Sequence, residues 1–304
     1  MSSRELVILG TASQVPTRQR NHNGYILRWD DEVILFDPGE GTQRQMTLAG
    51  VSPASITAIC ITHFHGDHCL GLPGVLARFA LDQLERPVDL YFPASGLEYL
   101  DRLRKAAIFT DWPYLRTHAV AGERVRFDRT GAALIGARLD HRVEAIGWRI
   151  EEPDGRRMLP ERLTAAGIEG PEIGRLQRDG AIELDGRRVS VEEMSEPRRG
   201  QRFAFIMDTG LCDAAVELAV GADLVVCEAT FRDADADLAD RYRHLTAGQA
   251  AGIAARAGAG TLVLTHFSQR YQEVDDSFLA EAGRVFPDVV IARDLLTVPV
   301  PRVG

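Results

Sequence analysis

The sequence predicts an α/β fold in which two β-sheets pack face to face and helices cover their outer faces. Two observations lead to this prediction. Short runs of β-branched and apolar residues, each bounded by Gly, Pro, Asp or Asn, recur in both halves of the chain, as expected for strands. Segments with apolar residues at helical spacing lie between these runs.

The predicted strands and helices alternate along the chain. Strands are expected at residues 6–9, 24–27, 33–36, 56–61, 88–92, 132–139, 145–150, 202–206, 224–227, 262–264 and 289–291. Helices are expected at residues 41–48, 72–84, 97–106, 214–220, 246–257 and 277–285. Pro73 lies in the first turn of the second helix, where its missing N–H costs no hydrogen bond. Thr246 is expected to cap the helix that continues through Gln249.

The composition, with 45% hydrophobic and 26% charged residues, is typical of a soluble globular protein. No apolar run approaches the roughly 20 residues that span a bilayer. The first residues show no signal-peptide pattern, so we expect a cytoplasmic enzyme with no membrane partner.

The four cysteines have no paired spacing and indicate no disulfide framework. A net charge of −9 argues against a general affinity for polyanions, although nearly all basic residues are arginines, which suit bidentate phosphate contacts.

Residues 151–201 differ from the rest of the chain. They are rich in charge and glycine, poor in aromatic residues, and lack long apolar periodicity. Residues 167–174 form a turn-prone centre. The segment is therefore either a disordered linker or an extension that projects from the body. Its acidic and basic residues roughly balance, so charge alone does not mark it as an RNA-binding arm.

Residues 63–68 (HFHGDH) predict a metal site, because they place three imidazoles and a carboxylate within six residues. In an extended or sharply turned backbone, alternate side chains share a face, so His63 and His65 can reach one metal together. Asp67 and His68 follow a glycine that permits a tight turn, and they can serve a second metal beside the first. We therefore predict a two-metal hydrolase, with zinc as the expected ion.

Three further candidate ligands directly follow predicted strands. His141, Asp208 and His266 each lie just past an apolar run, as the histidine-rich run does. A carboxylate at position 208 can bridge two metal ions held about 3.5–4 Å apart. His22 and His118 lack this position and are expected to be surface or satisfied polar residues.

These motifs resemble the metallo-β-lactamase superfamily and, within it, ribonuclease Z, the family of tRNA 3′-processing endonucleases. The matching segments are residues 36–43, 62–74, 139–149, 208–209 and 265–271, together with residues 228–231 and 244–246, which resemble two motifs that separate this branch from lactamases and glyoxalases. The histidine-rich run alone is specific only to the superfamily. The later motifs, in this order and spacing, are far more specific.

The resemblance implies an αβ/βα four-layer sandwich, with residues 1–304 forming one metallo-β-lactamase domain. Residues 151–201 would be an inserted, flexible, projecting arm that serves as a tRNA-binding exosite, usually across a homodimer. Two Zn²⁺ per subunit are implied, one held by His63, His65 and His141, the other by Asp67, His68 and His266, with Asp208 bridging them. The implied partner is precursor tRNA.

In the implied reaction, the metals lower the pKa of a water to about 7, and the resulting hydroxide attacks phosphorus. Asp67 accepts the proton of the nucleophile. His244, with Glu228, would stabilise the phosphoryl oxygens and protonate the leaving oxygen. Glu228 has an alternative role as a structural carboxylate that holds His244. Asp37 is implied to be structural support near the metals, and by placement Asp37 and Asp140 are candidate acceptors for the ligand histidines.

Several alternatives remain open at this stage. The chain either removes the 3′ trailer from precursor tRNA, leaving a 3′-hydroxyl, or is a small-molecule hydrolase (a phosphodiesterase, arylsulfatase or lactonase) on the same scaffold. The chemistry at the metals is nearly identical, so the arm and the Glu228–His244 pair are the discriminators. A non-enzymatic RNA-binding protein is disfavoured because all seven expected ligands are present.

The polar loop at residues 11–21, with two arginines, either holds phosphate or is a solvated turn. Cys69 is expected to be a buried thiol rather than a ligand.

Overall fold

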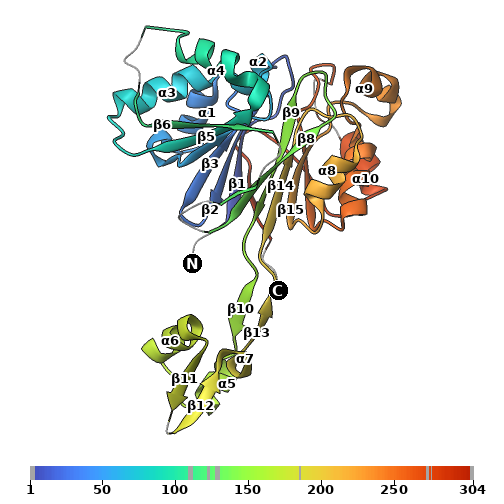
Figure 1. The fold of residues 1–304 in the computed structure, drawn as a ribbon. Coiled ribbons are helices and arrows are strands. Elements are labelled where there is room, and N and C mark those ends of the chain that lie inside the picture. Colours follow the sequence, from blue (N-terminus) through green and yellow to red (C-terminus); the bar gives the residue numbers. More distant parts are fainter. Residues whose placement is uncertain are drawn as a thin grey trace. The chain divides into compact units, whose positions relative to one another are not determined.

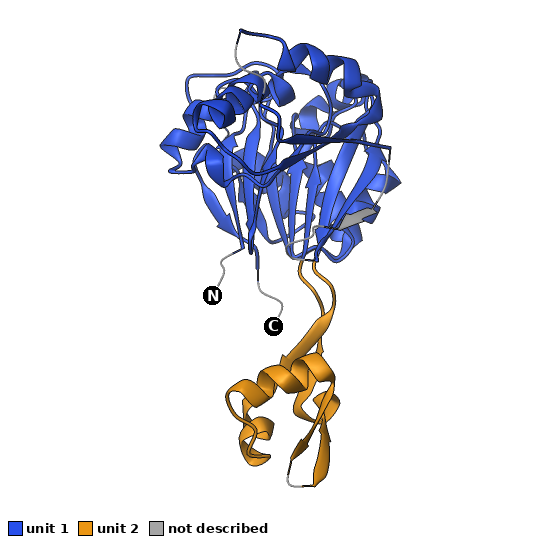
Figure 2. Cartoon of the chain, turned by 60° about the vertical axis from the view of Figure 1, so that its left-hand side comes forward, with its two compact units in different colours: residues 1–151, 202–302 blue, residues 152–201, 303–304 orange. Residues whose placement is uncertain are grey.

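The computed structural model describes residues 4–108, 112–121, 124–126, 131–184, 186–271, 274 and 276–301. These residues form two compact units (Figure 2). The main unit contains the described residues up to Glu151 and from Arg202 onward, and the second unit contains residues 152–201.

The main unit contains two sheets, each with seven strands among the described residues. The first sheet has the order β18 (Thr297–Pro299), β1 (Glu5–Gly10), β2 (Gly24–Trp29), β3 (Glu32–Phe36), β4 (Ala58–Cys60), β5 (Val88–Pro93) and β6 (Leu115–Val120). The second has the order β17 (Val289–Ile291), β16 (Thr261–Thr265), β15 (Leu224–Glu228), β14 (Arg202–Ile206), β9 (Ala145–Glu151), β8 (Ala133–Leu139) and β7 (Arg124–Arg126). Strands β3 to β6 are parallel, as are β14 to β17, so their carboxyl ends share one edge of each sheet.

Aromatic side chains pack the two sheets against each other. The ring of Phe36 on β3 stacks on Phe205 of β14 with centroids 4.6 Å apart, and Tyr25 meets Phe205 edge-on at 5.1 Å. Trp148 on β9 is fully buried in the same cluster. Burial of these large apolar surfaces is the main stabilising contribution to the sandwich.

Helices cover the outer face of each sheet (Figure 1). Helices α1 (Thr42–Leu48), α3 (Leu72–Leu81) and α4 (Leu97–Arg104) lie on the first sheet, and α8 (Asp213–Ala219), α10 (Ala247–Ala257) and α11 (Asp276–Gly283) lie on the second. Thr246 caps α10 as expected, in a reciprocal pair of hydrogen bonds with Gln249. The predicted two-sheet sandwich with outer helices is therefore confirmed. Within the described part of the chain, no helix combines the length and apolar character needed to cross a bilayer.

The second unit has its own secondary structure and core. Its elements are β10 (Gly155–Met158), α5 (Pro160–Ala165), α6 (Pro171–Asp179), β11 (Ala181–Leu184), β12 (Arg187–Ser190), α7 (Val191–Met194) and β13 (Ser195–Arg198). Leu163, Leu176, Val189 and neighbouring apolar side chains form a small buried cluster. The disordered-linker alternative is therefore wrong. The turn-prone centre is also shorter than expected, because α6 already begins at Pro171.

The predicted strands and helices of the main unit are all present, with small shifts at their ends. The elements not predicted are the strands β6, β7 and β18 and the short helices α2 (Gly66–Cys69) and α9 (Ala236–Tyr242). Strand β6 is an edge strand with mostly exposed or half-buried side chains, so its sequence lacks the apolar alternation that predicts a strand.

Candidate metal centre

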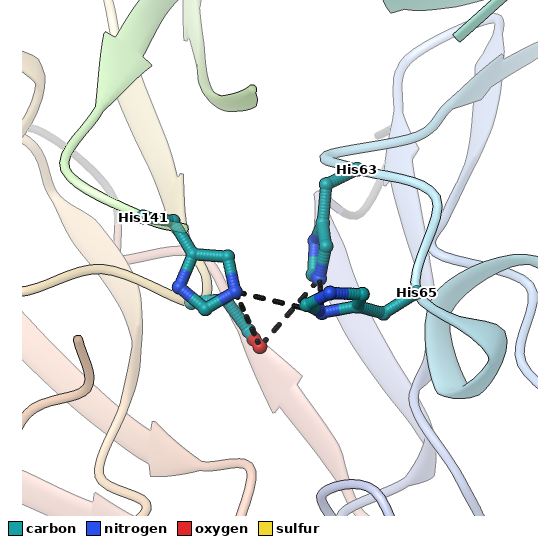
Figure 3. Close-up of side chains that lie close together, drawn as sticks. His63, His65 and His141 are labelled. Carbon is teal, nitrogen blue, oxygen red and sulfur yellow. Dashed lines mark hydrogen bonds and ion pairs between the residues drawn. The ribbon is translucent and has the colours of Figure 1, made fainter. Parts of the chain in front are cut away.

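The first group of candidate ligands joins the two sheets. His63 and His65 lie in the loop after β4, and His141 lies in the loop after β8. The Nε2 of His63 is 2.9 Å from the Nδ1 of His65, and the Nε2 of His141 is 3.5 Å from the same Nδ1. Figure 3 shows His141 pointing toward the other two rings from the opposite side. Three imidazole nitrogens from both sheets therefore converge on one point.

The second group lies beside the first. Asp67 and His68 belong to the one-turn helix α2, and His266 follows β16. The Oδ2 of Asp67 is 3.3 Å from the Nε2 of His68 and 3.5 Å from the Nε2 of His266. One ligand atom from each of the three residues lies within 4.8 Å of the other two.

Asp208, just after β14, lies between the two groups. Its Oδ1 is 3.2 Å from the Nε2 of His68 and 3.1 Å from that of His266. Its Oδ2 is 3.6 Å from the Nε2 of His63 and 3.9 Å from that of His141. Each carboxylate oxygen therefore faces a different group, which is the arrangement a bridging ligand requires.

The geometry and chemistry of both groups fit a metal site. The Oδ1 of Asp208 and the Nε2 of His266 are buried and have no hydrogen-bond partner among the described residues. A buried polar atom without a partner is costly, and a cation between the converging atoms would satisfy both. Imidazole nitrogens with carboxylate oxygens form a ligand set that suits zinc.

Asp37 orients two of the candidate ligands by accepting hydrogen bonds, one directly and one through Thr62. His68 donates from Nδ1 to the Oδ2 of Asp37 at 2.8 Å. His63 donates from Nδ1 to the hydroxyl of Thr62 at 3.1 Å, and that hydroxyl donates to the Oδ2 of Asp37 at 2.7 Å. With Nδ1 protonated, the Nε2 of each ring presents a lone pair to the site. Asp37 thus occupies the supporting position expected from the sequence.

A second hydroxyl orients His266 in the same way. Its Nδ1 donates to the Oγ1 of Thr230 at 2.7 Å, and this hydroxyl donates to the Oε2 of Glu228 at 2.6 Å. The roles of Thr62 and Thr230 could not be predicted from the sequence. Their only signal was proximity to His63 and Glu228 in the chain.

The expectation for Asp140 was wrong. His141 donates from Nδ1 to the backbone oxygen of Arg243 at 3.1 Å, whereas the side chain of Asp140 pairs with the guanidinium of Arg243 at 3.1 Å. A backbone carbonyl can replace a carboxylate as the acceptor for a ligand imidazole. Every residue has such a carbonyl, so this partner cannot be recognised in the sequence.

Four non-glycine residues in and around the site have positive φ. The values are 44° at Asp37, 32° at Asp208, 57° at Arg243 and 64° at His266. Such a backbone conformation costs on the order of 1–3 kcal/mol per residue and persists where the surrounding structure enforces it. Asp37 and His266 directly follow strands β3 and β16, and Asp208 comes two residues after the end of β14. Backbone strain is therefore found at the strand ends from which side chains enter the site.

Burial shifts the protonation of the first group. It lowers the pKa of His63, His65 and His141, and neighbouring imidazoles lower it further, while Asp208 opposes the shift. These imidazoles are neutral at pH 7, which is the form that binds a metal. Burial disfavours the carboxylate of Asp208, but the facing imidazoles of His266 and His68 hold its pKa well below its usual range.

Glu228 and His244 form a buried pair at the edge of the site. The Oε1 of Glu228 accepts hydrogen bonds from the Nδ1 of His244 at 2.9 Å and from the backbone N–H of Thr209 at 2.8 Å. Burial lowers the pKa of His244, but Glu228 and Asp208 overcome it and raise that pKa to about 9. Glu228 is fully buried, whereas His244 lines the cavity. The geometry favours the structural alternative for Glu228, as the residue that holds His244.

A cavity of about 360 Å³ opens onto the candidate ligands. It is lined by Ser13, Gln14, His65, Asp67, His141, Arg142, Asp208, Thr230, Phe231, Tyr242, His244, His266, Ser268, Gln269 and Arg270. The loop at residues 11–21 contributes Ser13 and Gln14 but neither of its arginines. Arg20 is buried and donates to the backbone oxygens of Ser268 and Tyr271, at 3.2 and 2.6 Å, so it supports the fold.

Three residues outside the metal groups behave as the sequence indicated. Cys69 is buried, and its thiol donates to the backbone oxygen of His65 at 3.2 Å. His22 contacts the backbone oxygen of Gln14 at 3.1 Å, and His118 pairs with Asp89 at 2.7 Å. Both histidines are satisfied polar residues.

Comparison with known proteins agrees with this geometry. The family model of the metallo-beta-lactamase superfamily matches residues 17–266. The chain is 60% identical to ribonuclease Z of Nocardia farcinica and 55% identical to ribonuclease Z of Streptomyces avermitilis, in each case over 99% of both chains. The crystal structure of human tRNase Z, short form, superposes with a TM-score of 0.67 at 26% identity, covering 98% of this chain and 100% of the human one. The chain belongs to the ribonuclease Z family of the metallo-β-lactamase superfamily.

Proposed function

We propose that this protein is a metal-dependent endoribonuclease that removes the 3′ trailer from precursor tRNA, with two zinc ions per subunit. One observation carries the proposal: six candidate ligands from both sheets converge around a seventh, Asp208, in a chain 60% identical over 99% of its length to a ribonuclease Z. The first metal would be held by His63, His65 and His141, the second by Asp67, His68 and His266, and Asp208 would bridge them.

Zinc bound there would supply positive charge for the phosphate oxygens and would lower the pKa of an attacking water. Asp67 would take the proton of that water, and its position in the lining of the cavity beside Asp208 supports this role. Burial raises the pKa of this carboxyl, but the facing imidazoles of His68 and His266 outweigh burial and lower it, so Asp67 is ionised at neutral pH.

His244 would protonate the leaving 3′ oxygen in this proposal. Its Nε2 lies 3.9 Å from the Oδ2 of Asp208, and its Nδ1 is held by Glu228. The raised pKa keeps the ring protonated at pH 7. Zinc bound at the neighbouring ligand groups would oppose this protonation and so lower the pKa of His244. Glu228 is a positioning residue in this scheme.

We further propose residues 151–201 as the arm that binds tRNA, in a cytoplasmic homodimer. Two arginines of α6, Arg175 and Arg178, are exposed. Arginine on an exposed helix suits contacts to the phosphate backbone of RNA, which is recognised largely by shape and backbone.

The test is cleavage of a precursor tRNA that carries a 3′ trailer by the purified, metal-loaded protein. We expect one endonucleolytic cut at the junction between tRNA and trailer. Turnover of bis-p-nitrophenyl phosphate without any cut in the precursor would support the alternative, a small-molecule hydrolase on the same scaffold.

A further inference from the structure

Tyr242 is an aromatic residue in the lining of the cavity, and it has no role in the proposed chemistry. It is the last residue of α9, it lines the cavity, and 39% of its surface is exposed. The ring of Phe231, which is almost fully buried, lies nearly parallel to it, with an interplanar angle of 16° and centroids 6.4 Å apart. An exposed aromatic ring backed by a buried one is a flat surface of the kind that stacks on planar ligands.

Arg142 also contacts this ring and lines the same cavity. Its guanidinium carbon lies 5.0 Å from the ring centroid of Tyr242, within the range of a cation–π contact. Its Nη2 donates to the backbone oxygen of Arg241 at 2.5 Å. The Tyr242 ring and the guanidinium are therefore held together as one unit.

The same segment is tied to the candidate ligands. The backbone oxygen of Arg243, the residue after Tyr242, accepts the hydrogen bond from the Nδ1 of His141. Arg243 has a φ of 57°, so the chain turns sharply here and carries His244 into the site as the next residue. The position of the Tyr242 ring is thus fixed relative to both His141 and His244.

We propose that Tyr242, supported by Arg142 and Phe231, is the platform on which a nucleobase next to the scissile phosphate stacks. The inference rests on the proposed function and names how its RNA substrate is positioned. Single-stranded RNA is typically bound by aromatic side chains that stack on its bases together with cations that follow its backbone. A phosphate alone would use Arg142 but would gain nothing from an exposed tyrosine ring. Stacking is tolerant of sequence, so such a platform would accept any of the four bases.

The first test compares kcat/KM for a precursor tRNA among variants of the metal-loaded protein. Tyr242→Ala should lower kcat/KM by roughly ten- to a hundredfold, the usual loss for one stacked base, whereas Tyr242→Phe should stay near wild type. Tyr114→Ala is the matched control, because Tyr114 is 40% exposed but does not line this cavity. Equal losses in the Ala and Phe variants would overturn the proposal, because they would assign the effect to the hydroxyl.

The second test removes the base instead of the ring. Precursors with an abasic nucleotide on the 5′ or on the 3′ side of the cut are cleaved by wild type and by Tyr242→Ala. For one of these substrates the penalty of Tyr242→Ala should disappear, because ring and base contribute to one interaction. The same penalty on the intact and on both abasic precursors would contradict the proposal. Cleavage of the intact precursor by wild type separates that outcome from failure of the proposed function itself.

Discussion

Thr62 and Thr230 each lie between a candidate metal-ligating imidazole and a buried carboxylate. In both cases the hydroxyl accepts a hydrogen bond from the Nδ1 of a histidine and donates one to Asp37 or Glu228. This arrangement selects the tautomer whose Nε2 is free to bind a metal. The two carboxylates thereby act on the site without contacting the cavity themselves.

Thr230→Val tests this role, because valine keeps the shape of the side chain and removes the hydroxyl. His266 and Glu228 each lose a buried partner, so we expect metal affinity to fall by about 10- to 100-fold. Competition with a chromophoric chelator measures that affinity. Thr230→Ser keeps the hydroxyl and should bind metal as wild type does. Wild-type affinity in the valine variant would show that the hydroxyl does not orient His266.

The candidate ligands could be predicted from the sequence, but their supports could not. His141, Asp208 and His266 were recognisable because each follows a strand, and strand ends of one layer meet at a common edge. The hydroxyl relays and the carbonyl of Arg243 depend on distances between segments far apart in the chain. Local sequence carries no record of such distances, which is also why Asp140 was assigned wrongly.

At the scale of elements, the histidine-rich loop packs tightly against the turn that follows β3. A Cβ atom added at Gly39 would lie 2.2 Å from the backbone oxygen of Asp67 and 2.6 Å from that of Asn23. A Cβ at Gly71 would lie 2.0 Å from the backbone oxygen of Gly39. These glycines let two backbone segments approach closely enough to set the position of the carboxylate of Asp67.

Gly39→Ala should therefore displace the loop that carries Asp67. We expect a loss of stability of about 1–3 kcal/mol, as for an overpacked core, together with weaker metal binding. Thermal unfolding and metal titration measure the two effects. Gly252→Ala in α10 is the control, since its new methyl group meets no atom within 4 Å and alanine favours a helix by about 0.5–1 kcal/mol. Unchanged metal affinity in Gly39→Ala would show that this packing does not position the ligands.

The elements missing from the prediction share a physical cause. Strand β18 pairs with β1 from the opposite end of the chain, and Leu6 lies opposite Val298. A segment of three residues acquires strand structure only through such a partner. The core of the second unit is likewise built from apolar residues spaced irregularly over residues 163–194. This spacing has no helical or strand period, so the sequence did not predict a core there.

At the scale of the whole molecule, the chemistry and the second unit are separable in the chain. Residues 152–201 leave and rejoin the second sheet between Glu151 of β9 and Arg202 of β14, which are directly opposite each other in adjacent antiparallel strands. A two-residue turn can connect such a pair. The main unit can therefore be closed without the second one.

Replacing residues 152–201 by Asn-Gly should leave the main unit folded, with turnover of bis-p-nitrophenyl phosphate close to wild type. Cleavage of precursor tRNA should fall much more, because the proposed arm contacts are lost while the metal site stays intact. The double variant Arg175→Ala, Arg178→Ala is a milder form of the same test. Equal losses on both substrates would show that this segment is no substrate clamp.

We expect the converging imidazoles and carboxylates to direct a water, rather than the 2′-hydroxyl of the RNA, onto the scissile phosphorus. Chemical mapping of the ends produced from a precursor tRNA tests it most directly. Attack by water should leave a 3′-hydroxyl on the tRNA body and a 5′-phosphate on the released trailer. A 2′,3′-cyclic phosphate on the tRNA body would contradict it, because that product forms only when the neighbouring 2′ oxygen is the nucleophile.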